Sequence, residues 1–338
     1  MLTGRETVAA TFAATAHLHR DRPARIDVAA DGGYRRTSWG SVVRTVRHVA
    51  LALAGDGIGP GVPLPLDRAV PPAHRAAVLL VAAATGAVVT GGSDGHLELD
   101  LETLALAGAL LDERHPDRFE VLVARRDRHE VLLCAGGVEH THASLLVAAR
   151  SFAQGAGVGP GDGVSIELRP GTAVEAVLAT LVPALTGATA WTSRAGPELP
   201  ATDAGVTWTV SDVPPPPGPP PRRRRLGRPR PTGARHLLLL GDGGAMQLAE
   251  PSVRVGAALS VEAAGGIVTG FGPPGTVGRP LPGVSVTVDR GEVLVRSGGT
   301  PPGAPGLRAD GWLATGRLGS LQGGALVLEP AAALSGQA

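Results

Sequence analysis

The stretch GIGPGVPLPL at residues 57–66 recurs in altered form as GVGPGDGVSIEL at residues 157–168. Each copy precedes an apolar segment, a glycine and a second apolar strand: HRAAVLLVAAATGAVVTG at 74–91 and VEAVLATLVPALTGATAW at 174–191. Apolar strands that alternate with helices indicate parallel sheets covered on both faces, and a duplicated unit indicates two copies of one arrangement. The sequence therefore predicts an α/β fold with two similar α/β subdomains whose sheets are largely parallel.

Two further segments have the alternating pattern of antiparallel strands. RIDVAADGGYRRTSW at 25–39 predicts a hairpin that turns at its Asp-Gly-Gly. GVSVTVDRGEVLVRS at 283–297 alternates on both sides of Asp-Arg-Gly, which predicts a smaller β-rich subdomain. ADGWLATGRLGSL at 309–321 is expected to form a strand, a tight turn and another strand, with Arg317 at the tip of the turn.

A segment rich in proline and arginine, residues 213–234, interrupts the α/β pattern. Proline excludes regular structure, so we expect an extended, exposed linker. The predicted division is paired α/β subdomains over 1–212, this linker, and the rest of the α/β subdomain with the β-rich subdomain over 235–338. Its run Arg222 to Arg225 could bind phosphate or nucleic acid, but such runs in linkers are usually only solvated.

Composition excludes several classes of function. The 338 residues carry a net charge of +1, so nucleic acid is not an expected partner. The sequence contains no lysine, so no amine can act as a phosphate clamp or base. Cys134 is the single cysteine, which excludes an internal disulfide. The N-terminus lacks the apolar core of a signal peptide, and the apolar run 76–89 is too short to span a bilayer. We therefore expect a soluble, cytoplasmic protein.

Several motifs occur in the order and spacing of one known family. They are TSWGSVVRTVRHVALALAGDGIGPG at 37–61, GGVEHTHASLLVAA at 136–149, TVGRPLPGVSV at 276–286, GEVLVRSGG at 291–299 and DGWLATGRLGSL at 310–321. Together they resemble the large domain of the adenylate-forming, AMP-binding superfamily, and within it the acyl-CoA synthetases, which include the long-chain fatty acid–CoA ligases. The resemblance implies a reaction of ATP and magnesium with a carboxylate to give an acyl-adenylate and pyrophosphate, followed by transfer of the acyl group to a thiol.

The resemblance also implies where a nucleotide site would lie. The positions that match the family's site are Thr141 and His142 after the phosphate loop, Gly243, Gly244 and Ala245 at the adenine pocket, Gly265 in the Tyr-Gly-x-Thr-Glu motif, and Thr315 in the Thr-Gly-Asp motif. We interpret these residues as a vestigial nucleotide site. Thr141 and His142 are also explained as the start of a helix, and Gly243 to Ala245 as a turn at a strand end.

The chain departs from the family at every position that carries the chemistry. No Ser/Thr/Gly-rich loop precedes Gly136, which falls where the family has a lysine. Val268 falls in the place of the magnesium carboxylate, with Ala264 and Ile267 in the places of its Tyr and Thr. Arg317 replaces the aspartate that accepts hydrogen bonds from the ribose, and arginine has no acceptor. The sequence ends at Ala338, so we expect the family's C-terminal domain, with its catalytic lysine, to be absent.

These departures predict a catalytically inactive pseudoenzyme with no catalytic residue, no metal ligand and no bound ATP or magnesium. Its expected role is that of a partner or regulator of a full-length acyl-CoA synthetase. The alternative is a residual ATP-dependent carboxylate (fatty acid)–CoA ligase that retains carboxylate or nucleotide binding and borrows a C-terminal domain from another chain. Nucleotide binding and adenylation, with and without a partner ligase, would discriminate the two.

Other motifs suggest other chemistry. GGSDG at 91–95 matches the nucleophile elbow of serine hydrolases, with Ser93 as nucleophile, but an alternating segment follows it where the elbow needs a helix. Cys134 with His140 and His142 could form a metal cluster, although the spacing fits no zinc pattern. GDGGAM at 241–246 lacks the last glycine of a dinucleotide fingerprint.

Overall fold

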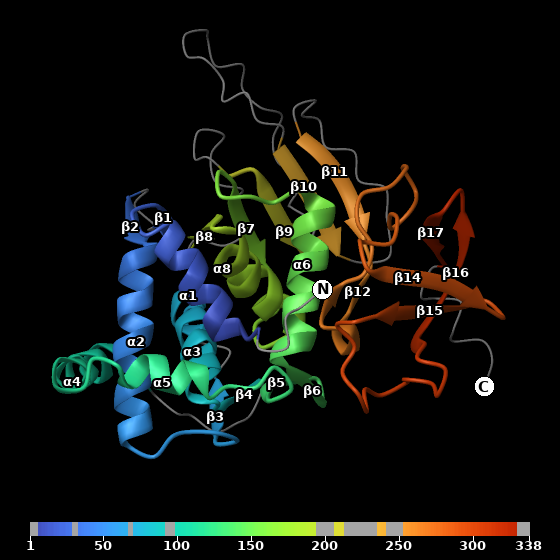
Figure 1. The fold of residues 1–338 in the computed structure, drawn as a ribbon. Helices are drawn as coiled ribbons and strands as arrows, with labels where there is room; N and C mark the ends of the chain where they lie inside the picture. Colours follow the sequence, from blue (N-terminus) through green and yellow to red (C-terminus); the bar gives the residue numbers. More distant parts are fainter. Residues whose placement is uncertain are drawn as a thin grey trace, which may run out of the picture.

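The computed structural model describes residues 6–28, 33–66, 70–91, 99–193, 206–212, 235–240 and 253–329. Two mixed sheets, mainly parallel, with their helices form one body, and a separate antiparallel sheet lies beside it (Figure 1). The predicted α/β fold with a smaller β-rich subdomain is therefore confirmed. The predicted linker, residues 213–234, lies outside the described residues, as do Ser93 and Gly243 to Ala245.

The larger sheet has seven strands in the order β11-β10-β9-β7-β8-β1-β2. All neighbouring strands are parallel except β1 and β2, which form the antiparallel hairpin that the sequence predicts. The strands are β1 (Pro23–Val28), β2 (Tyr34–Ser38), β7 (Gly163–Glu167), β8 (Thr189–Ser193), β9 (Trp208–Ser211), β10 (Arg235–Leu240) and β11 (Val253–Ala258). The hairpin precedes the first repeat in the chain, yet it pairs with β8 of the second repeat.

The smaller mixed sheet has the order β3-β4-β5-β6. Strands β3, β4 and β5 are parallel, and β6 returns antiparallel to β5. Its strands are β3 (Pro63–Leu66), β4 (Val88–Gly91), β5 (Val131–Ala135) and β6 (Val138–Thr141).

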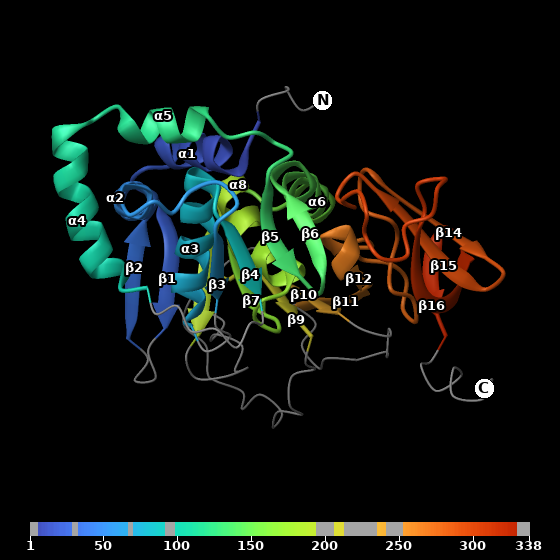
Figure 2. The same ribbon diagram turned by 90° about the horizontal axis from the view of Figure 1, so that it is seen from below.

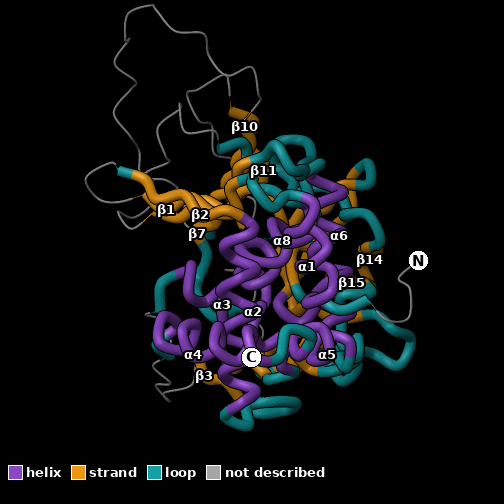
Figure 3. Tube along the Cα trace, turned by 60° about the vertical axis from the view of Figure 1, so that its left-hand side comes forward, coloured by secondary structure: helices purple, strands orange, loops and turns teal. Residues whose placement is uncertain are grey.

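Helices cover these sheets and pack on one another in one continuous apolar core. They are α1 (Val8–Leu18), α2 (Trp39–Gly55), α3 (Pro72–Thr85), α4 (Leu101–Arg114), α5 (Arg118–Ala124), α6 (His142–Ala156), α7 (Ala173–Glu175) and α8 (Val182–Thr186). In the middle of the molecule, helix α1 contacts α3, α6 and α8, and α6 contacts α8 (Figure 3). None of the helices in the described ranges is long and apolar enough to cross a membrane.

The two repeats end their long helices in the same way. Gly86 follows α3 and Gly187 follows α8, both in the left-handed conformation, with φ of 84° and 74°. Glycine adopts this conformation without the steric cost of a Cβ atom, which ends a helix and returns the chain toward a strand. The long helix of the second repeat differs from α3, because a π-helical segment, η1 (Ala176–Leu181), joins α7 to α8. Pro183 has no N–H to donate into the preceding turn, which accounts for the wider hydrogen-bond spacing there.

The β-rich subdomain is an antiparallel sheet in the order β14-β15-β16-β17 with its own apolar core. Its strands are β14 (Val284–Asp289), β15 (Glu292–Ser297), β16 (Leu313–Gln322) and β17 (Ala325–Leu328), and a short 3₁₀ turn η2 (Glu262–Ala264) lies between β12 (Ser260–Val261) and β13 (Gly266–Ile267). The expected turn with Arg317 at its tip is wrong. Thr315 to Arg317 lie inside β16, where the register against β15 shifts, so they form a β-bulge.

Candidate functional site

A cavity of about 230 Å³ opens at the carboxyl ends of the strands of the larger sheet. Ligands of open α/β sheets bind at this edge, because the loops that follow the strands meet there. Arg169 follows β7 and Asp212 follows β9, so polar side chains converge on the cavity. Its lining residues are Leu168, Arg169, Thr172, Val174, Asp212, Leu240, Ser260 and Glu262. No sequence motif pointed to Arg169, Asp212 or Glu262. Arg169 directly follows the repeated segment 157–168, and Glu262 lies three residues before the matched Gly265; these positions were the available signals.

Glu262 lies in the wall of this cavity and is held by backbone amides. Its carboxylate accepts a hydrogen bond from the backbone N–H of Ala173 and one from that of Val174, at the start of α7. Burial raises the pKa of Glu262; the two amides act against this rise, and the nearby Glu175 adds to it. The Glu262 carboxylate thus occupies the backbone N–H groups at the start of α7. Such free N–H groups at a helix start would otherwise favour an anionic ligand.

The turn of the β5–β6 hairpin lies against this carboxylate. Ala135 pairs with Val138, so Gly136 and Gly137 alone join the two strands. Both have positive φ, 57° and 76°, which is the signature of a type I′ hairpin turn. A Cβ on Gly136 would lie 3.3 Å from Cγ of Glu262. The place that corresponds to the family's phosphate loop is therefore a two-residue turn next to a negative charge.

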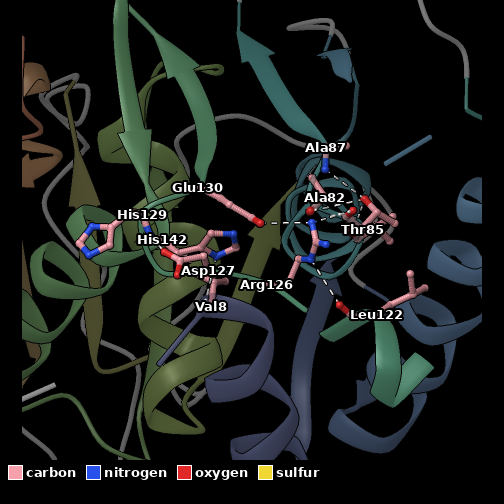
Figure 4. Close-up of polar contacts among 11 residues, drawn as sticks. Val8, Ala82, Thr85, Ala87, Leu122, Arg126, Asp127, His129, Glu130 and His142 are labelled. Carbon is pink, nitrogen blue, oxygen red and sulfur yellow. Dashed lines mark hydrogen bonds and ion pairs between the residues drawn. The ribbon is translucent and has the colours of Figure 1, made fainter. Parts of the chain in front are cut away.

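Thr141 and His142 begin helix α6. The Thr141 hydroxyl accepts from the backbone N–H of Ser144 at 3.2 Å, and the Ser144 hydroxyl accepts from that of Thr141 at 3.0 Å. This reciprocal capping box satisfies two backbone donors at the helix start. Nδ1 of His142 accepts from the backbone N–H of Val8 at 3.3 Å (Figure 4), and burial lowers the pKa of His142 to about 4. Both side chains thus have structural partners.

The cation near this helix start, Arg126, is also committed to structure (Figure 4). Its Nη1 donates to the backbone oxygen of Thr85, at the end of α3, and to Oε2 of Glu130, both at 3.2 Å. Its Nε donates to the backbone oxygen of Leu122 at 3.3 Å. A positive side chain at a helix C-terminus satisfies backbone carbonyls that lack partners, so Arg126 stabilises α3.

The segment that matches the Tyr-Gly-x-Thr-Glu motif, residues 264–268, is buried between the core of the α/β body and the core of the β-rich subdomain. Gly265 ends the 3₁₀ turn with φ of 76°. A Cβ on it would lie 3.6 Å from Nδ1 of His140, so it packs against β6. Val268 is 1 % exposed, and its cluster includes Val138, Val277 and Val293. A carboxylate in this apolar surrounding would have no partner, so this place suits a valine.

The bulge in β16 uses its polar groups within its own sheet. The Thr315 hydroxyl donates to the backbone oxygen of Val293 at 2.7 Å and accepts from the backbone N–H of Arg317 at 3.2 Å. The backbone N–H of Gly316 donates to Oε1 of Glu292 at 3.3 Å. Gly265 thus lies against His140 of β6 and Ala148 of α6, whereas the hydrogen bonds of Thr315 stay within the β-rich sheet. Within the described ranges, no group of three or more His, Cys, Asp or Glu side chains could hold a metal ion.

The sequence matches no protein-family model and no curated protein. Solved structures are nevertheless similar. The N-terminal domain of FACL13 from Mycobacterium tuberculosis superposes with a TM-score of 0.68 at 16% identity, covering 96% of this chain and 100% of that domain. MenE from E. coli gives 0.68 at 17% identity over 97% of this chain and 77% of its own.

A benzoate CoA ligase from Burkholderia xenovorans LB400 is similarly close, with a TM-score of 0.69 at 18% identity over 96% of this chain and 79% of its own. All three similarities extend over almost the whole chain, and the two α/β units and the antiparallel sheet are included. The chain therefore has the fold of the N-terminal domain of the adenylate-forming, AMP-binding superfamily of acyl-CoA ligases.

Proposed function

We propose that this protein is a catalytically inactive acyl-CoA synthetase-like protein that acts as a partner or regulator of an active, full-length synthetase. The observation that carries the proposal is the two-residue turn at Gly136 and Gly137. A triphosphate needs several backbone N–H groups aimed at its oxygens, and a type I′ turn closed by its own ladder presents no such cradle.

The charge around this turn supports the same proposal. Glu262 lies beside Gly136, and Glu175, which pairs with Arg75, is close enough to Glu262 for the two carboxylates to repel each other. A nucleotide phosphate placed beside this turn would meet the carboxylate of Glu262, while the cation that lines the neighbouring cavity is Arg169. Two unit charges 4 Å apart repel by about 4 kcal/mol at the effective dielectric of a protein surface. This is as large as the whole net free energy of millimolar binding, about 4 kcal/mol.

The other two motif positions point in the same direction. Val268 is buried among valines where a magnesium ligand would be needed, and Glu292 already accepts from the bulge that would face the ribose. Loss of one electrostatic contact typically costs a few kcal/mol of barrier. Loss of the loop, the metal ligand and the ribose acceptor together leaves no route to adenylation. The proposal includes the cytoplasmic location that the sequence predicts.

One observation favours the alternative of a residual carboxylate–CoA ligase that needs a C-terminal domain from another chain. The cavity of about 230 Å³ remains open at the carboxyl ends of the strands, with Arg169 in its wall. An arginine could hold a carboxylate there. Under this alternative, carboxylate binding would persist without the nucleotide.

The decisive experiment is exchange of labelled pyrophosphate into ATP with a panel of aliphatic and aromatic carboxylates. We expect the purified chain to match a heat-denatured control. In the same assay a full-length synthetase from the same organism is the positive control, and this chain is then added to it in increasing amounts. A change in the rate of the synthetase supports the partner role. Exchange by this chain alone supports the ligase. So does exchange with a carboxylate that neither protein uses by itself but that the two proteins use together.

A further inference from the structure

The outer face of helix α4 exposes apolar side chains. Leu106 is 72% exposed and Leu110 is 57% exposed, although leucine is among the residues most often buried in folded proteins. The helix lies at one edge of the molecule, away from the β-rich subdomain (Figures 1 and 2). A pair of leucines one helical turn apart on an edge helix is the type of surface that binds another helix.

The inner face of α4 is fixed tightly to α2, so the two faces have separate roles. A Cβ on Gly108 would lie 1.7 Å from the backbone oxygen of His48, so the helices touch at their backbones. Asp112 accepts from Nε of Arg47 at 2.8 and 2.9 Å. The helix is therefore held in place by its inner face, and its outer face is presented rigidly.

The outer face has a self-complementary order of side chains. Glu102, Leu106, Leu110 and Arg114 stand four residues apart and form one ridge, with both charged ends exposed. Such i±4 ridges of two helices pack alongside each other at a crossing angle near −50°. A two-fold axis through residue 108 would run the two ridges antiparallel. It would set Leu106 against Leu110 of the second copy and Glu102 against its Arg114.

We infer that this chain forms a two-fold symmetric dimer through the outer face of α4. The occupant is a second copy because the reversed ridge complements itself: acid then meets base, and leucine meets leucine. The antiparallel arrangement also sets the positive end of one helix dipole near the negative end of the other. A contact of this kind is isologous, so it closes as a dimer and does not extend into a filament.

The size of the face sets the expected strength. A helix of 14 residues is about 21 Å long, so one helix pair buries less than the roughly 1,200–2,000 Å² of a standard stable interface. The dimer should therefore be reversible, with a dissociation constant of about 10 to 100 μM. This association does not depend on nucleotide and is independent of the proposed lack of catalysis.

Sedimentation equilibrium of the full chain over a wide concentration range is the test. We expect a monomer–dimer equilibrium that Leu106→Glu abolishes and that Glu102→Arg weakens at least about fivefold, since each dimer contains two such pairs. Arg114→Glu should weaken it similarly. The double variant Glu102→Arg with Arg114→Glu should restore the dissociation constant to within about threefold of the original.

The control is Leu18→Glu, because Leu18 is 76% exposed but lies on α1. It should leave the equilibrium unchanged, and circular dichroism should show that every variant keeps its helix content. A strict monomer at all concentrations would overturn the inference. So would a dimer that the α4 variants leave intact, or a double charge exchange that weakens the dimer further.

Discussion

Arg75 and Glu175 form an ion pair that joins the two repeats of the chain. Nη2 and Nε of Arg75 lie 3.0 and 3.2 Å from Oε1 of Glu175, and the two residues are 100 positions apart in the sequence. Arg75 lies near the start of α3, and Glu175 lies in α7, at the start of the corresponding helical segment of the second repeat. Each residue is 7% exposed. The repeated helices therefore face each other through a buried charge pair at equivalent points.

Removal of one partner of this pair should strongly destabilise the protein. Arg75→Met or Glu175→Met alone leaves a buried charge without a partner, and we expect the free energy of unfolding to fall by about 3–5 kcal/mol. The double variant should lose much less, because two apolar side chains can pack together. Urea unfolding of the three variants measures the coupling. As a control, Arg25→Met removes a partly exposed pair with Asp27 and should cost less than about 1 kcal/mol.

Acid should destabilise the fold through its buried histidines. Burial lowers the pKa of His140 and of His142 to about 4, from an ordinary value of 6.5. Between these values the unfolded chain binds protons that the folded chain does not, so stability falls as the pH drops from 6.5 toward 4. Each histidine contributes up to about 1.4 kcal/mol per pH unit. The buried Glu175 and Glu262, whose pKa values are raised, act in the opposite direction over the window above 4.5.

A single variant separates the effect of the histidines on the pH dependence of stability from the effect of the glutamates. His140→Leu should reduce the slope of the unfolding free energy against pH between pH 4 and 6.5 by the contribution of one histidine, up to about 1.4 kcal/mol per pH unit. His140 is suitable because neither of its ring nitrogens has a hydrogen-bond partner in the described part of the chain. Exposed His129→Gln is the control, and an equal flattening by both variants would contradict the assignment.

Thr141 should act as a helix cap rather than as a ligand contact. Thr141→Ala removes the acceptor for the Ser144 N–H, and we expect a loss of about 1 kcal/mol in the free energy of unfolding. Thr141→Ser keeps the cap and should be nearly neutral. Thermal unfolding with and without ATP and magnesium measures both effects. A shift on adding nucleotide that the alanine variant removes would show that Thr141 contacts a ligand.

Restoration of the ribose acceptor should not restore nucleotide binding. Arg317→Asp supplies one acceptor, worth about 1.5–3 kcal/mol, whereas millimolar affinity needs about 4 kcal/mol net. Calorimetric titration of the wild type and the variant with ATP and magnesium should show no binding tighter than about millimolar. Tight binding by the wild type would make Arg317 a phosphate contact. Tight binding by the variant alone would mean that the rest of the pocket is intact.

The sequence by itself determined the local structure of this protein. The repeated Gly-Pro turn, strand, helix and glycine gave both α/β units, because apolar periodicity and left-handed glycines act over a few residues. The same local rules gave the β1–β2 hairpin and the alternating strands of the β-rich subdomain. The matched motifs also indicated the absence of the phosphate loop, which became visible as the turn at Gly136 and Gly137.

The tertiary structure decided which elements meet. The β1–β2 hairpin, which precedes the first repeat, pairs with β8 of the second repeat, more than a hundred residues later. Thr315 and Arg317 read as a turn, yet pairing with β15 converts them into a bulge. Glu262 reaches the start of α7, and Arg75 reaches Glu175, only after the sheets have packed. Periodicity specifies which face of an element is apolar, but the partner of that face depends on contacts between distant segments, whose loop-closure cost and packing no local pattern records.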